Sequence, residues 1–174
     1  MSIADLLVRE FTQECANTRK TLERVPADPE KWNWKPHEKS GSLGWMAAHV
    51  ASLAGFAYAA VTTTELDLAN VQMPKIESQA GLLPAFDQLS ATTADAIAKV
   101  TDAQFSETWT LRRGDMVLFA RPRYEIVRGM CFNHLIHHRG QLTMYLRTLN
   151  VPVPALYGPS ADENPFAQQA AQKR

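Results

Sequence analysis

Cysteine is scarce in this sequence, and charge of neither sign predominates. The 174 residues include two cysteines, Cys15 and Cys131, and both fall in segments with a helical pattern. This placement excludes a disulfide framework, and a reducing cytoplasm is the simplest setting. The 18 Lys and Arg residues are balanced by 18 Asp and Glu residues. Because no strongly basic surface can form from such a balance, we expect no nucleic-acid partner.

Long hydrophobic runs and targeting segments are also lacking. No apolar run approaches the roughly 20 residues that a membrane-spanning helix needs, so we expect no membrane partner. The first residues, Met1–Asp5, have neither the basic start nor the apolar core of a signal peptide. No internal repeat or low-complexity block interrupts the chain. We therefore expect one cytoplasmic domain over residues 1–174, with 161–174 as a frayed tail.

What the sequence does contain is four segments with helical periodicity. Hydrophobic residues recur every three or four positions over residues 2–24, 43–61, 78–100 and 122–149, which predicts four amphipathic helices. Between the third and fourth segments, two short apolar runs flank Arg112–Asp115 and predict a β-hairpin with a Gly-containing turn. The expected fold class is all-α, a four-helix bundle with one short hairpin.

Three histidines interrupt the apolar faces of two of these helices. His134 and His138 are four residues apart, so their side chains point the same way, and His49 lies on the apolar face of the second helix. The predicted inward face of the last helix consists of Val127, Cys131, His134, His138, Leu142, Tyr145 and Leu149. A buried histidine needs partners for both ring nitrogens. A divalent transition metal bound by His49, His134 and His138, with one coordination position open, would supply them.

Other interpretations of these residues remain open at this stage. The histidines could be hydrogen-bonded core residues that bind no metal. Cys131 could be a fourth ligand, although a buried core thiol is the better interpretation. His137 is rotated around the helix and is expected at the surface, and Gly140 predicts the close approach of another helix. From helical phase, three aromatic residues are expected to line the mouth of the site: Trp45, Tyr145 and Tyr157.

Three segments resemble the DinB/YfiT-like superfamily of metal-dependent enzymes. Asn133–Leu142 looks like the family's His-x-x-x-His-Arg-x-Gln signature, and Leu43–Val50 resembles the segment that supplies its first histidine. Val153–Asp162 is similar to a tail seen in many members. The resemblance implies a four-helix bundle in up-down-down-up order, often a homodimer. It also implies that zinc or nickel is held by residues matching His49, His134 and His138.

The three-histidine site and the resemblance together leave three functions open. Characterised relatives include S-transferases that use bacillithiol or mycothiol and a mycothiol-dependent maleylpyruvate isomerase. We expect a metal-dependent S-transferase whose partners are a low-molecular-weight thiol and a small-molecule substrate. The alternatives are a metal-dependent hydrolase and a non-enzymatic metal-binding stress-response protein. Glu10 and Glu125 are the candidate general bases of a hydrolase, but no sequence pattern places either beside the histidines, and no catalytic residue is assigned.

Overall fold

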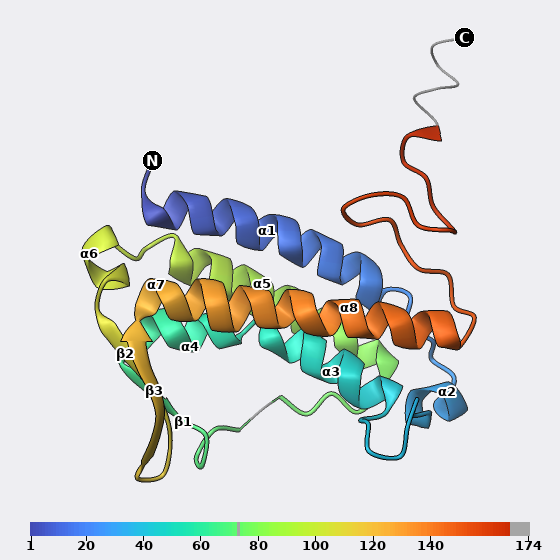
Figure 1. Cartoon of the computed structure of the whole chain (residues 1–174), viewed down its shortest axis with the longest axis horizontal. Helices are drawn as coiled ribbons and strands as arrows, with labels where there is room; N and C mark the ends of the chain where they lie inside the picture. Colours follow the sequence, from blue (N-terminus) through green and yellow to red (C-terminus); the bar gives the residue numbers. More distant parts are fainter. Residues whose placement is uncertain (73, 168–174) are drawn as a thin grey trace.

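The computed structural model describes residues 1–72 and 74–167, and the protein is mostly helical over these residues (Figure 1). The end of the predicted tail, residues 168–174, lies outside the described residues. The longer helices are α1 (Ile3–Leu22), α3 (Leu43–Leu53), α4 (Phe56–Thr62), α5 (Gln79–Ile97) and α8 (Asn133–Thr148). The shorter ones are α2 (Pro29–Asn33), α6 (Asp102–Phe105), α7 (Arg123–Glu125) and the π-helix η1 (Ile126–Phe132).

Local capping residues explain where two of the long helices begin. Ser2 and Asp5 form a reciprocal capping box at the start of α1, in which each side chain accepts from the other residue's backbone N–H. The hydroxyl of Ser42 accepts a hydrogen bond of 3.1 Å from the backbone N–H of Trp45 and starts α3. The predicted second helix is in fact two helices, because the helix is interrupted between Leu53 and Phe56.

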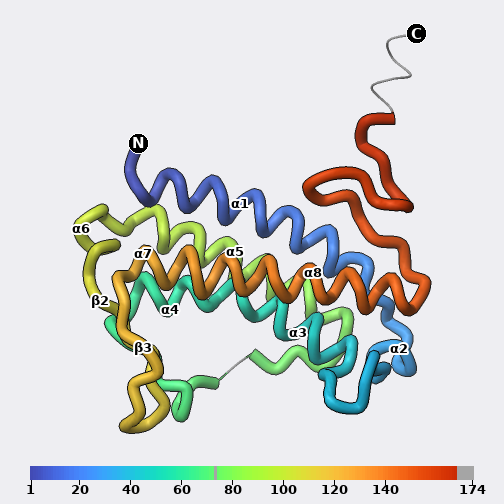
Figure 2. Tube along the Cα trace, in the orientation of Figure 1, coloured from blue at the N-terminus to red at the C-terminus, as the bar shows by residue number. Residues whose placement is uncertain are grey.

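The long helices lie side by side around one hydrophobic core. In Figures 1 and 2, α1 and α8 run from left to right, whereas α3, α4 and α5 run from right to left. Helix α1 packs on α5 and α8, and α3 packs on the same two helices. Phe11 of α1 stacks on Phe132 of η1 with ring centroids 5.3 Å apart, in the middle of this core. The contact between α3 and α8 places the helices that carry the three histidines next to each other.

One stretch of the core is longer and more apolar than expected from the sequence. Leu43–Thr62 is 20 residues long and apolar enough to cross a membrane by length and composition. Such a stretch is weak evidence for a membrane span, because a core helix passes the same test. Here 56% of the apolar window is buried against the rest of the protein. The packing of α3 and α4 on their neighbours accounts for the composition.

The protein also contains a three-stranded sheet, so the expected all-α class is wrong in this detail. The predicted hairpin is present as β2 (Thr108–Arg113) and β3 (Met116–Pro122), and Gly114 adopts a φ of 57° in the turn. A further strand, β1 (Glu65–Asp67), pairs with β2 in parallel, which gives the order β1-β2-β3. Three residues are too few to show a strand periodicity in the sequence.

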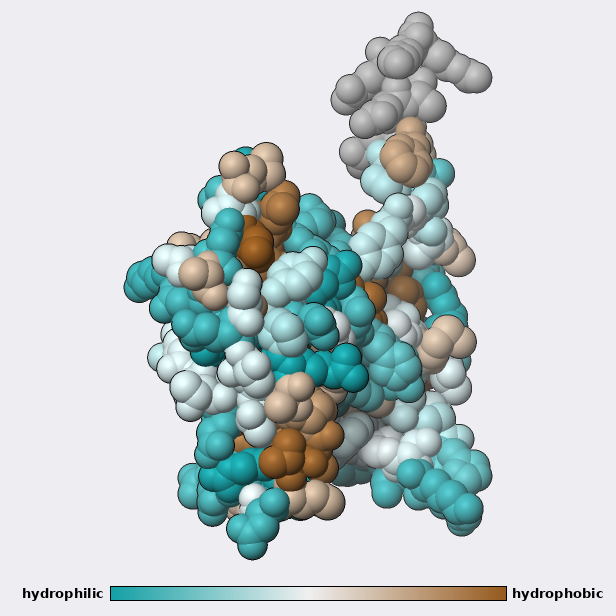
Figure 3. Space-filling model, turned by 60° about the vertical axis from the view of Figure 1, so that its left-hand side comes forward, coloured by the Kyte–Doolittle hydropathy of each residue, from teal (hydrophilic) through white to brown (hydrophobic). Residues whose placement is uncertain are grey.

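The sheet is anchored to the helices through β2 and is exposed along most of β3. Trp109 of β2 is fully buried, and its indole N–H donates to the hydroxyl of Thr63 over 3.2 Å. By contrast, Val117 and Leu118 of β3, whose side chains point to opposite faces of the sheet, are 58% and 42% exposed. Figure 3 shows hydrophobic residues gathered at the height of the strands. Strand β1 lies on the far side of β2 from this edge and faces the site described below.

The predicted inward face of the last helix is confirmed at Val127, Cys131 and Leu142, which are buried, but the core positions of α8 beside the histidines are shifted by one residue. The buried residues of α8 are Leu135, Arg139, Leu142 and Leu146. The histidines at positions 134 and 138 are half-buried and lie beside this face, not at its centre. The reason is η1, whose i to i+5 hydrogen bonding changes the phase of the helix that follows. The expected periodicity of 3.6 residues does not hold across such a turn.

Two glycines give a matched test of helix packing. The predicted close approach at Gly140 is wrong, because an added Cβ there meets no atom within 4 Å. At Gly44, a Cβ would lie 2.2 Å from Cε2 of Trp32. We expect Gly140→Ala to raise the free energy of unfolding by about 0.5–1 kcal/mol, and Gly44→Ala to lower it by about 1–3 kcal/mol. Urea unfolding measures both, and equal effects of the two substitutions would contradict this packing.

Candidate metal centre

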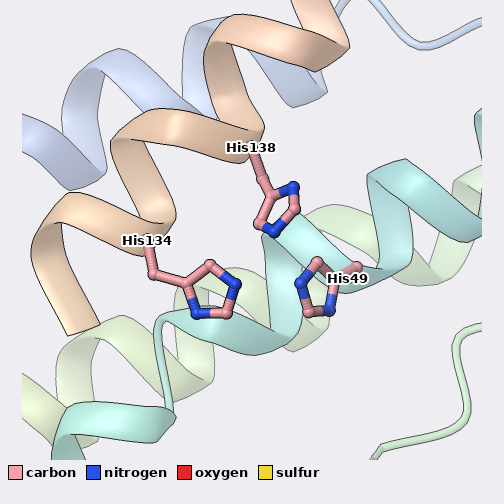
Figure 4. Close-up of side chains that lie close together, drawn as sticks. All are labelled: His49, His134 and His138. Carbon is pink, nitrogen blue, oxygen red and sulfur yellow. The ribbon is translucent and has the colours of Figure 1, made fainter. Parts of the chain in front are cut away.

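The structure brings all three predicted histidines together. One donor atom from each of His49, His134 and His138 lies within 4.8 Å of the other two. The ring centroids of His49 and His134 are 5.4 Å apart, and the other two pairs are 4.6 Å apart. In Figure 4, the rings on α8 and the ring on α3 surround one common space, and each turns a nitrogen toward it. We call these three residues the histidine cluster.

The cluster depends on where helix α8 begins. His134 is the second residue of α8, directly after the π-helix η1, and His138 follows one turn later. π-helical turns are rare and often mark functional sites. The π-helix changes the phase of α8, so that Leu135 and Arg139 point into the core and the two histidines face α3. His49 meets them from the middle of α3.

The hydrogen bonds of the rings favour metal ligation over a purely structural role. His138 Nδ1 lies 2.7 Å from Oε1 of Gln141, so Nδ1 carries the proton and the lone pair of Nε2 is left for a ligand. His134 Nδ1 is buried and has no hydrogen-bond partner among the described residues. A core histidine with a structural role would have both nitrogens satisfied. His49 is held by stacking on Trp45, with centroids 5.1 Å apart.

The electrostatics keep the cluster in the form that binds metal. Burial, with the neighbouring rings of His138 and His134, lowers the pKa of His49 from 6.5 to about 4. Burial also lowers the pKa of His134 and of His138, although the hydrogen bond to Gln141 opposes the shift at His138. Neutral imidazole is the ligating form. The three rings are therefore neutral and ready for a metal at pH 7.

The same pKa shift predicts how the metal-free protein responds to acid. Histidine in the unfolded chain takes up its proton near pH 6.5, whereas folded His49 does so only near pH 4. Between these values the unfolded state binds more protons, so stability is lost as the pH falls from 6.5 toward 4. We expect His49→Gln to flatten this part of the curve of unfolding free energy against pH. The exposed His37→Gln is the control, and an equally steep curve for His49→Gln would contradict the assignment.

The residues present fit a divalent transition metal. Three imidazole donors from two helices form the cluster, and no fourth His, Cys, Asp or Glu of the described residues joins it. Three protein ligands with one open position are typical of a catalytic metal, whereas structural sites are closed by four. Imidazole suits zinc, nickel, copper and iron, so the donors alone do not select among them.

An apolar cavity opens beside the cluster, and its wall differs from the one expected from the sequence. Its volume is about 420 Å³, and His49 and His134 form part of its wall. The wall also includes Met130 of η1, and Leu66 and Leu68, which lie in β1 and just after it. The sequence offered no signal for this part of the wall, because β1 and the residues after it read as a polar connection. Gln141 was also missed, although its position three residues after His138 is a recognisable spacing on a helix.

Other sequence predictions near the site are resolved by the structure. Cys131 is a buried core thiol outside the cluster, and burial raises its pKa. His137 is exposed, as predicted. Neither candidate base is at the cluster, because Glu10 pairs with Arg128 and Glu125 pairs with Arg121.

Of the three aromatic residues predicted at the mouth, one lies beside the cluster. Trp45 stacks on His49. Tyr145 follows His138 by seven residues, roughly 10 Å along the helix, and packs edge-on against Trp34 instead. Tyr157 donates to Glu14 on α1 over 2.6 Å, away from the cavity. The predictions for Tyr145 and Tyr157 at the mouth are therefore wrong.

The fold and the cluster together define a mostly helical protein with a three-histidine site that could bind a metal ion. The family model described as DinB family matches residues 1–171, and the chain belongs to this family. The sequence resemblance to DinB-like proteins is thereby confirmed. No curated protein matches the chain significantly.

Solved structures of DinB-like proteins share the fold. A DinB-like protein from Bacillus cereus ATCC 10987 is 21% identical, with a TM-score of 0.68 over 90% of this chain and 98% of that one. A DinB-like protein from Bacillus subtilis is 20% identical, with a TM-score of 0.66 over 86% and 96%. A member of the family from Exiguobacterium sibiricum 255-15 is 20% identical, with a TM-score of 0.61 over 87% and 94%. At these identities the likeness concerns the fold alone.

Proposed function

We propose that this DinB-family protein is a metal-dependent S-transferase that joins a low-molecular-weight thiol to a small electrophile. His49, His134 and His138 would hold the metal, with zinc or nickel as the expected occupant. The observation that carries the proposal is the position of the cluster, whose three neutral rings converge and two of whose members, His49 and His134, form part of the wall of an apolar cavity. The proposal includes the family's four-helix bundle in up-down-down-up order, and a cytoplasmic homodimer as the working form.

The chemistry follows from the ligand set. Three neutral imidazoles leave a divalent ion with its full positive charge, which favours the thiolate form of a thiol at the open position. In the transfer, the thiol sulfur forms a bond to an electrophilic carbon while the bond from that carbon to the leaving group breaks. The leaving group departs with the bonding electron pair, and the thiol proton passes to water.

The protein's own residues position and protect this reaction. Gln141 fixes the orientation and tautomer of His138 through its hydrogen bond to Nδ1. Trp45 covers one face of His49 and holds that ring toward the cluster. The apolar cavity receives the body of the electrophile and keeps water away from the reacting carbon.

The two alternatives have less support. A hydrolase needs a general base for its water, and no carboxylate is found among the described residues that line the cavity. A non-enzymatic metal site would be expected to close its fourth position with a side chain. The cluster has three members among the described residues, and it adjoins a cavity instead.

The test is thiol conjugation by the metal-loaded protein. Cysteine, glutathione, coenzyme A, bacillithiol and mycothiol are each incubated with monobromobimane, and the thioether is quantified. We expect conjugation with at least one thiol, and a return to the uncatalysed rate in His49→Ala or after chelation. His137→Ala, which alters an exposed ring outside the cluster, is expected to keep the activity. No conjugation with any thiol, or full activity in His49→Ala, would rule the proposal out.

A further inference from the structure

The walls of the cavity carry information about the electrophile. Its described lining residues come from α3, α4, α5, η1, α8, the strands β1 and β2, and the segment after β1, and most are aliphatic or aromatic. Apart from His49 and His134, the polar side chains on the wall are Ser52 and Gln72. The hydroxyl of Ser52 already donates to the carbonyl oxygen of Ala48 over 2.8 Å. The cavity therefore has little capacity to solvate a polar ligand away from the histidines.

Charge is absent from this wall. None of the described lining residues is Asp, Glu, Lys or Arg. An ionised group in the body of the cavity would lose its hydration and find no partner of opposite charge. Compensation is available at the end where His49 and His134 lie, and hydration at the solvent-exposed stretch Val71–Gln72. A charge on the part of the ligand that lies against Leu66 and Leu68 would stay uncompensated.

The size of the cavity limits the ligand as well. An apolar cavity of about 150 Å³ holds a benzene molecule. The volume of about 420 Å³ found here therefore has room for a ring with substituents. It also falls within the range of roughly 300–1,000 Å³ that is common for small-molecule sites.

From these observations we infer that the cavity binds the electrophile, and that the electrophile is an uncharged, largely apolar molecule of about one substituted ring. The inference rests on the proposed S-transferase function. The reactive carbon lies at the histidine end, and the apolar body extends toward Leu66 and Leu68. Electrophiles that carry a carboxylate or an ammonium group on the body are excluded as good substrates.

A pair of isosteric ligands tests the inference without any turnover. Binding of 4-tert-butylbenzyl alcohol and of 4-(trimethylammonio)benzyl alcohol to the metal-loaded protein is measured by calorimetry in the absence of thiol. We expect the neutral compound to bind at least about ten-fold more tightly. Val71→Glu, at the solvent-exposed part of the cavity wall, should weaken binding of the neutral ligand and strengthen binding of the cation. Val117→Glu on β3 should change the affinity for neither. Equal affinities in the unchanged protein, or equal effects of the two substitutions, would overturn the inference.

The same pair as benzyl bromides, together with a 4-carboxylate analogue, separates this inference from the proposed S-transferase function. With an accepted thiol, kcat/KM for 4-tert-butylbenzyl bromide should exceed that for the trimethylammonio and 4-carboxylate analogues at least about ten-fold. Conjugation of all three bromides at similar rates would overturn the inference and leave the S-transferase standing. Selective binding of the neutral alcohol with no conjugation of any bromide would refute the S-transferase and support the selectivity of the cavity.

Discussion

Replacing His138 with alanine is expected to abolish tight metal binding while leaving the fold intact. The substitution removes one of three donors that lie within 4.8 Å of one another, together with the ring that Gln141 orients. Loss of a residue that only supports a ligand costs about 10–100-fold in metal affinity. Loss of the ligand itself should therefore exceed about 100-fold. Metal content after dialysis and competition with a chelator measure the effect.

His137→Ala is the matched control for this experiment. His137 is the adjacent residue on α8, its ring centroid is 4.9 Å from that of His138, and it is exposed and outside the cluster. We expect it to retain the metal and the affinity of the unchanged protein. Thermal unfolding of both metal-free variants shows whether the fold is kept. Full metal retention by His138→Ala would mean that the cluster is not the metal site.

The histidine cluster was predictable from sequence because its determinants are local. Two imidazoles four residues apart on one helix share a face whatever the rest of the fold does. The contribution of His49 needed one further assumption, that the second and last helices are neighbours, and the packing of α3 on α8 confirms it. The hairpin was equally local, since its Gly-containing turn and two apolar runs are continuous in the chain.

The features that sequence did not predict depend on contacts between distant segments. Strand β1 pairs with β2 across more than forty residues of chain, and the wall of the cavity exists only because of that pairing. The core positions of α8 beside the histidines were predicted one residue out of place, because a π-helical turn leaves no clear mark on hydrophobic periodicity. One of the residues that point inward is Arg139, and an arginine is not predicted in a core from sequence because charged side chains are rarely fully buried.

Arg139 lies at the centre of a buried polar network between α8, α1 and the C-terminal segment. Its guanidinium is 2.7 Å from Oε2 of Glu14, and it donates to the backbone oxygen of Glu14 over 3.0 Å and to Thr18 over 3.2 Å. The hydroxyl of Tyr157 accepts from Arg139 and donates to Glu14. Tyr157 is 69% exposed, but partial desolvation of its hydroxyl and the hydrogen bond to Glu14 raise its pKa, which keeps this donor protonated.

Arg139→Met is expected to lower the free energy of unfolding by about 3–5 kcal/mol, because it leaves the carboxylate of Glu14 buried without its cation. Arg147→Met is the control, since Arg147 pairs with Asp162 at the surface with 42% of its side chain exposed and should cost no more than about 1 kcal/mol. Adding Glu14→Gln to Arg139→Met removes the unpaired buried charge, so the double variant should be more stable than Arg139→Met alone.

Urea unfolding of all three variants distinguishes a buried ion pair from a packing role of the Arg139 side chain. If Arg139→Met and Arg147→Met cost the same, the network contributes nothing beyond a surface pair. A large loss that Glu14→Gln fails to relieve would instead assign the effect to packing.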